Sequence, residues 1–151
     1  MYALALTCHL LAAIIWIGGM FFTYVCLRPS LAETLEPPQP ARLLAATLRR
    51  FFKWVWAAIA VLLLSGFYMA LSRYSLSAGP LWLYLMIGLG IVMMLLFAHI
   101  YFAPFTRLSN ALANAQPDDV PGAISQIRTI VAINLGLGLL LVVSVTLGRY
   151  L

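Results

Sequence analysis

Few groups in this sequence could do chemistry, and most of them are soft metal ligands. The candidates are Cys8, His9, Cys26, Met69, Met86 and His99. An imidazole combined with thiols and thioethers is a ligand set that suits Cu(I). The sequence holds no Cys-x-x-Cys motif, no phosphate-binding loop and no nucleophile–base pattern. These residue types therefore favour metal binding over nucleophilic catalysis or phosphoryl transfer.

Four charge-free apolar runs must position these groups. The chain has 151 residues, of which 64% are hydrophobic and 9% are charged, whereas a soluble domain is about half apolar and a quarter charged. A water-soluble globule is excluded, and so is a disordered chain. We predict an all-α fold: an integral membrane four-helix up-down bundle forming one domain over residues 1–151, without an internal repeat. The spans, each long enough for a bilayer, are about residues 3–27, 54–72, 81–102 and 129–148.

The basic residues predict the direction of the bundle. Seven of them fall in the two longer connectors, residues 28–53 and 103–128. On the opposite side of the membrane there are only Arg73 and Arg149. The positive-inside rule then places the connectors in the cytoplasm. We expect a multi-pass protein of the bacterial inner membrane with N- and C-termini in the periplasm. The expected partners are the lipid bilayer and either a second copy or a subunit of a membrane complex, but not nucleic acid.

Depth along the helices sorts the candidate ligands into two groups. His9 lies roughly 9 Å inside the outer face at helical rise, and Cys8, Met69 and Met86 are predicted at similar depth. These four residues form an outer candidate copper site. An ionisable residue within a span is costly and is a functional candidate by default, which applies to His9. Cysteine and methionine are also ordinary core residues, so packing is the favoured explanation for the other three.

The inner group surrounds His99, near the cytoplasmic end of the third span. Tyr101 follows it closely, and Cys26, Arg50 and Arg128 should lie near the same leaflet. The two arginines could hold haem propionates or a quinone head group, or they could simply follow the positive-inside rule. His9 and His99 should be separated by about 20 Å along the membrane normal. This separation argues against one haem bound by both histidines within a monomer.

Local signals predict where helices end and where they touch. Pro104 should end the third helix, and residues 107–115 should form a separate interfacial helix. Residues 43–53 should extend the second helix beyond the membrane. Asn134 needs a partner within the membrane, so we expect it to join two helices. Close helix contacts are also expected at Gly18-Gly19, Ser65-Gly66, Gly88/Gly90 and Gly136/Gly138.

Trp16 lies two turns after His9 on the same face of the first span. The segment from His9 through Trp16 to Gly18-Gly19, followed by Arg28-Pro29, resembles the first helix of the copper resistance protein D (CopD) family. The second span resembles that family in residues 49–52 and 64–66, and the third in residues 97–101. The resemblance implies a short four-helix member that handles copper by uptake, transfer or resistance, as a carrier or accessory protein rather than an enzyme.

The same histidines are also similar, more distantly, to haem-containing protoporphyrinogen oxidases of the HemJ type. The shared pattern combines His9, Trp16 and Gly19 with His99 and Tyr101. This second resemblance implies haem b with His9 or His99 as an axial ligand, and a membrane redox protein. A third hypothesis is a structural or assembly subunit of a membrane complex.

Overall fold

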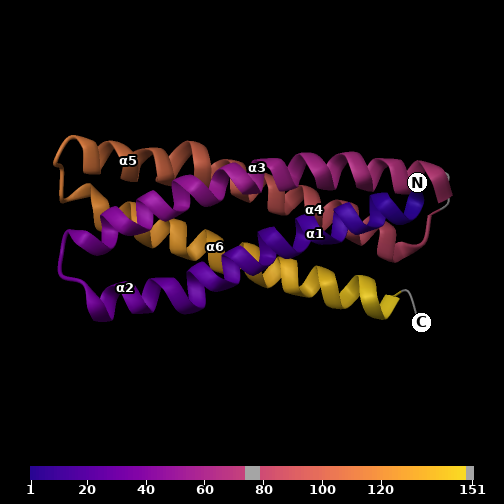
Figure 1. The fold of residues 1–151 in the computed structure, drawn as a ribbon, viewed down its shortest axis with the longest axis horizontal. Coiled ribbons are helices and arrows are strands. Elements are labelled where there is room, and N and C mark those ends of the chain that lie inside the picture. Colours follow the sequence, from indigo (N-terminus) through magenta and orange to yellow (C-terminus); the bar gives the residue numbers. More distant parts are fainter. Residues whose placement is uncertain (74–78, 149–151) are drawn as a thin grey trace.

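The computed structural model describes residues 1–73 and 79–148, and these form four long helical segments that alternate in direction (Figure 1). The first runs through α1 (Tyr2–Phe21), a π-helical segment (Phe22–Leu27) and α2 (Arg28–Thr34), and the second is α3 (Gln39–Arg73). The third runs through α4 (Leu81–Ile100), a π-helical segment (Tyr101–Phe105) and α5 (Thr106–Ala113), and the fourth is α6 (Asp119–Gly148). The described residues contain no strand, which confirms the all-α prediction.

All four segments are long and apolar enough to cross a membrane. They contain 30 to 35 residues each, so they are roughly 45 to 53 Å long at 1.5 Å per residue. A hydrocarbon layer about 30 Å thick cannot cover that length, and each segment must project beyond it. The predicted extension over residues 43–53 is confirmed, because α3 begins at Gln39. The first span also continues past residue 27, up to Thr34.

The two ends of the bundle differ. The terminal end holds the start of α1 and α4 and the finish of α3 and α6, and the loop end holds the connectors 35–38 and 114–118 (Figure 1). Seven basic residues lie in the loop-end half: Arg28, Arg42, Arg49, Arg50, Lys53, Arg107 and Arg128. Among the described residues, the terminal end carries Arg73, whose guanidinium lies 4.4 Å from the centre of the Tyr2 ring.

Pro104 does not end the third helix, so that prediction is wrong. The chain passes the proline through the π-helical segment Tyr101–Phe105 and continues as α5. A proline removes one backbone donor, and a wider turn with a nearby hydroxyl compensates for it inside a membrane protein. Near the proline, Thr106 Oγ1 donates to the Tyr101 carbonyl at 3.0 Å. The separate helix predicted at 107–115 is therefore the last part of the third segment, and it ends at Ala113.

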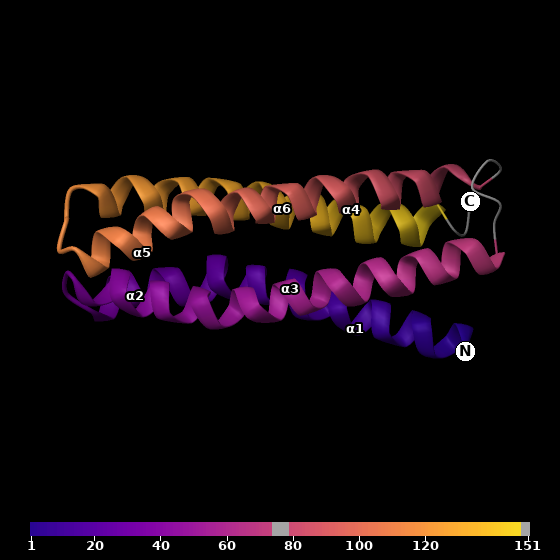
Figure 2. The same cartoon turned by 90° about the horizontal axis from the view of Figure 1, so that it is seen from above.

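The bundle consists of two similar hairpins packed face to face (Figure 2). One hairpin holds α1, α2 and α3, and the other holds α4, α5 and α6. Tyr2 and Leu81, where the hairpins begin, are 79 residues apart, and so are Thr34 and Ala113, where their first arms end. Each first arm also contains a π-helical segment at the matching place. The structure thus corrects the prediction of no repeat: the repeat is visible in element boundaries.

An aromatic cluster joins the hairpins, with members from α1, α3, α4 and the following π-helical segment. The cluster comprises Trp16, Phe52, Trp56, Phe97, Tyr101 and Phe105. Phe97 meets Phe52 edge to face, with ring centres 5.3 Å apart, and Trp16 at 6.1 Å. Such edge contacts between rings are favourable beyond simple burial. Ring packing between the pocket-bearing terminal half and the loop end therefore holds the two hairpins together.

Small and polar residues set some of the helix contacts but not all those predicted. A Cβ at Gly19 would lie 2.2 Å from the Phe51 ring, and one at Gly138 would lie 3.1 Å from Ile17 and Met93. Asn134 Nδ2 donates to the Met93 carbonyl at 3.3 Å, which confirms its role between two helices. The contacts expected at the other glycines are wrong, since a Cβ there would meet nothing within 4 Å: Gly18, Gly88, Gly90 and Gly136.

Candidate functional site

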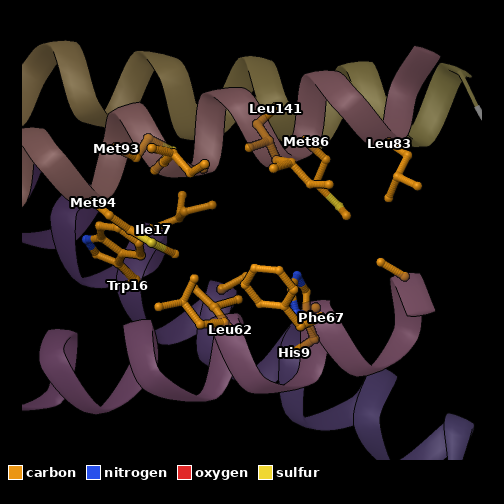
Figure 3. A pocket seen from close by; sticks show the side chains of 17 residues that line it. His9, Trp16, Ile17, Leu62, Phe67, Leu83, Met86, Met93, Met94 and Leu141 are labelled. Atoms are coloured by element: carbon orange, nitrogen blue, oxygen red, sulfur yellow. The ribbon is translucent and has the colours of Figure 1, made fainter. Parts of the chain in front are cut away.

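A pocket of about 200 Å³ lies between the two hairpins, in the terminal half of the bundle (Figure 3). Side chains from α1, α3, α4 and α6 line it. Of the 17 lining residues, only His9 and Trp16 carry polar side-chain atoms. Among the residues that the structure describes, His9 is therefore the one ionisable group of an otherwise apolar chamber.

The hydrogen bonds of His9 determine which ring nitrogen is available. Its Nδ1 lies 2.9 Å from Ser65 Oγ. The Ser65 hydroxyl has a single proton, which it donates to the Val61 carbonyl at 2.5 Å. The serine oxygen must then accept, so His9 Nδ1 carries the proton.

This arrangement leaves His9 Nε2 with a free lone pair. Among the described residues Nε2 has no hydrogen-bond partner, and His9 lines the pocket. Metal-binding histidines are commonly held in this way, with the other ring N–H fixed by an acceptor. The close approach of α3 is possible because residue 66 is glycine: a Cβ there would lie 3.3 Å from His9 Cε1. The Ser65-Gly66 pair, predicted only as a packing signal, thus seats the imidazole.

Thioethers from α4 supply the other soft atoms of the pocket. Met86, Met93 and Met94 all line it, and Figure 3 shows Met86 on the wall opposite His9. Met86, Gly90 and Met93 follow one another at helical spacing, so they share one face of α4. Met93 and Met94 were not predicted as site residues, although their spacing from Met86 was a usable signal.

The remaining outer candidates lie apart from this pocket. Cys8 is half-buried on α1 beside His9 in sequence, but it does not line the chamber. Met69 is buried on α3 with 8% of its surface exposed, and it also lies outside the lining. Of the four residues expected to share an outer site, the structure brings His9 and Met86 to one pocket.

The inner candidates do not join the pocket either. His99, Cys26, Arg50 and Arg128 are all exposed, and His99 Nε2 lies 3.4 Å from Gln126 Nε2. Because α1 and α4 start at the same end, the two histidines lie at different depths (Figure 1). Over residues 1–73 and 79–148, no three His, Cys, Asp or Glu side chains converge on a common point.

Two of the predicted cofactor residues belong to the aromatic cluster. Tyr101 packs against Phe52 and Trp56, with ring centres 6.1 and 5.7 Å apart. Trp16 is buried, and it forms both part of the pocket wall and part of the cluster. Trp16 therefore marks the boundary at which the pocket gives way to close ring packing.

Comparisons with known proteins identify the family to which this chain belongs. No curated protein and no solved structure matches the chain. The family model described as copper resistance protein D matches residues 45–147, which is well over half of the chain. The match covers most of α3, the whole of α4 and α5 and nearly all of α6, and so includes three of the four elements that line the pocket. With this extent of agreement over a four-helix membrane bundle, the chain belongs to the copper resistance protein D family.

Proposed function

We propose that this protein handles copper within the membrane and that the pocket holds Cu(I) as cargo. The observation that carries the proposal is the His9–Ser65 hydrogen bond, which leaves Nε2 available in a chamber lined by three methionines. Imidazole and thioether donors are soft ligands that select Cu(I). Membership of the copper resistance protein D family supports the same metal.

The charge of the pocket favours a monovalent ion. Its candidate ligands are a neutral imidazole and neutral thioethers, and no acidic residue lines it. The cost of bringing an ion into an apolar interior rises with the square of its charge. A divalent ion such as Zn²⁺ is usually held in proteins by thiolates, carboxylates or several imidazoles, whereas the lining of this pocket includes a single imidazole. Cu(I) carries a single charge and does not need them.

The role that fits best is that of a carrier or accessory protein. The pocket lies in the terminal half, and the aromatic cluster fills the space between the hairpins toward the loop end. Under the positive-inside rule the basic loop end is cytoplasmic, so the pocket would face the periplasmic half of an inner membrane. Copper would then be taken from the periplasmic side.

Met86 and Met69 provide a matched test, because only Met86 lines the pocket. Leucine has a similar volume to methionine but no sulfur. We expect Met86→Leu to weaken Cu(I) binding about tenfold. This is the lower end of the loss in metal affinity, about 10- to 100-fold, that follows when a group supporting a metal site is removed. The measurement is competition for Cu(I) against a chromophoric chelator, with protein in detergent. Met69→Leu should bind like the wild type, and equal loss in both variants would contradict the proposed site.

The alternative of haem b is separated by the visible spectrum. His9 in an apolar chamber fits an axial ligand, but the predicted propionate partners Arg50 and Arg128 do not line the pocket. The residues around the pocket thus fit the haem only in part. A stoichiometric Soret band in the purified protein, lost in His9→Ala, would favour haem over copper.

The proposed orientation has its own test. Because Arg73 is the only basic residue described at the terminal end, both termini should face the periplasm. Alkaline phosphatase joined after Leu151 should be active in cells, and a green fluorescent protein at the same place should stay dark. The reverse pattern would show that the bundle has the opposite orientation.

A further inference from the structure

The pocket has a mouth on the side of the bundle. Its lining includes four residues that are also exposed on the protein surface: Leu63, Phe67, Ile87 and Ile91. The first two lie on α3 and the last two on α4, so the mouth opens where the two hairpins meet. Counted from Arg73 and Leu81 at the terminal end, these residues lie roughly 9 to 15 Å into the bundle at helical rise. Because these exposed side chains are apolar and lie within membrane-spanning helices, we infer that the mouth faces lipid hydrocarbon.

The shape and walls of the pocket suit a single substituted ring. A dry cavity of about 150 Å³ can hold benzene, and this pocket measures about 200 Å³. Trp16 and Phe67 offer ring faces or edges, and Met86 and Met94 offer thioethers. Both kinds of group make favourable contacts with aromatic rings. An acyl chain would also fit the apolar walls, but it could not form a hydrogen bond with the one free polar atom of the lining, His9 Nε2.

That polar atom defines the chemistry of the occupant. With Nδ1–H donated to Ser65 Oγ, the Nε2 of His9 can only accept a hydrogen bond. A ligand that meets it therefore needs a donor, such as a hydroxyl carried on its ring. Because the mouth faces lipid, the ligand must also dissolve in the bilayer.

We propose that the pocket binds a membrane-soluble hydroxy-aromatic molecule of the quinol class, which enters sideways between α3 and α4. One ring hydroxyl donates to His9 Nε2, and the ring lies against Trp16 and Phe67. This goes beyond the copper proposal and uses the same lone pair. Since one lone pair serves one partner at a time, Cu(I) and the quinol should exclude each other.

The oxidised and reduced forms of one compound test the hydrogen bond. Decylubiquinol has ring hydroxyls, whereas decylubiquinone has the same skeleton and no donor. We expect the quinol to bind the wild-type protein in anaerobic nanodiscs about tenfold more tightly than the quinone, as one buried hydrogen bond provides. In His9→Phe, which keeps a ring but lacks the acceptor, the two affinities should become equal. Equal affinities in the wild type would overturn the proposal and indicate simple filling by apolar chains.

Two glycines of α4 test the location. A Cβ at Gly88 or at Gly90 would meet nothing within 4 Å, but only Gly90 lines the pocket. Gly90→Leu should therefore fill the chamber and reduce binding of both compounds at least tenfold, while Gly88→Leu should leave binding unchanged. Quinol binding that survives Gly90→Leu would place the ligand elsewhere and refute the assignment.

The copper proposal and the quinol proposal can be tested, and refuted, independently of each other. Cu(I) titration without quinol reports on copper alone, and quinol binding without metal reports on the lateral site alone. If both bind, Cu(I) added to the quinol complex should release the quinol in proportion to the metal bound. Simultaneous binding of both would contradict the shared lone pair.

Discussion

His9→Ala should weaken Cu(I) binding by more than about 100-fold, the largest effect expected of any ligand substitution here. Loss of a residue that merely orients a metal ligand costs 10- to 100-fold, and His9 is proposed as the ligand itself. Its Nε2 is the only nitrogen lone pair that the pocket can offer, because the Trp16 indole nitrogen is a donor. Competition against a chromophoric chelator measures the change.

Two further variants make this result specific. His99→Ala should bind Cu(I) like the wild type, since His99 is exposed and lies outside the pocket. Ser65→Val should lose about 10- to 100-fold, because Nδ1 would have no hydroxyl acceptor and the imidazole would no longer be held in one tautomer. Ser65→Thr keeps the hydroxyl and should recover most of the affinity. If His99→Ala were the damaging substitution, the copper site would have to lie in the inner group.

Phe97→Ala should lower the free energy of unfolding by about 3–5 kcal/mol, the range found when a buried aromatic side chain is truncated. Phe97 is 2% exposed and contacts four other rings: Trp56 at 5.2 Å, Phe52 at 5.3 Å, Trp16 at 6.1 Å and Tyr101 at 6.3 Å. Its removal leaves a cavity between the two hairpins. Because these rings come from α1, α3 and α4, they cannot easily close the space by local movement.

Phe102 is the matched control for this prediction. It lies five residues further along the third segment, but it is 68% exposed on the surface of the bundle. Phe102→Ala should therefore change the unfolding free energy by much less. Unfolding in mixed detergent micelles, followed by circular dichroism, measures both variants. A similar loss in both would mean that the aromatic cluster does not hold the hairpins together.

Charge-free runs predicted the fold well because a membrane imposes a simple rule on the sequence. The four spans, the up-down order and the extension of the second helix all follow from where charges stop. The continuation of the third helix through Pro104 did not follow, since it depends on a wider, π-helical turn. The repeat also escaped prediction, because the matching positions of two membrane hairpins need only be apolar and carry little identity.

The candidate site was predicted in part, for a geometric reason. Residue type and depth identified His9 and Met86, and helical spacing placed Trp16 on the same face as His9. Spacing on one helix cannot show which face of a neighbouring helix is opposite. The Ser65 partner on α3 and the Met93 and Met94 side chains on α4 depend on how the hairpins pack together. The same packing left Cys8 and Met69 outside the pocket.

The first arms of the two hairpins begin and end 79 residues apart, so positions along these arms can be compared one by one. Under this correspondence His9 matches Gly88, so the second hairpin has no imidazole at the equivalent position. A symmetric pair of histidines would have offered two nitrogens to one ion. In the pocket, the imidazole of His9 comes from the first hairpin and the thioethers of Met86, Met93 and Met94 come from the second. A metal bound there would therefore join two hairpins that supply different ligands.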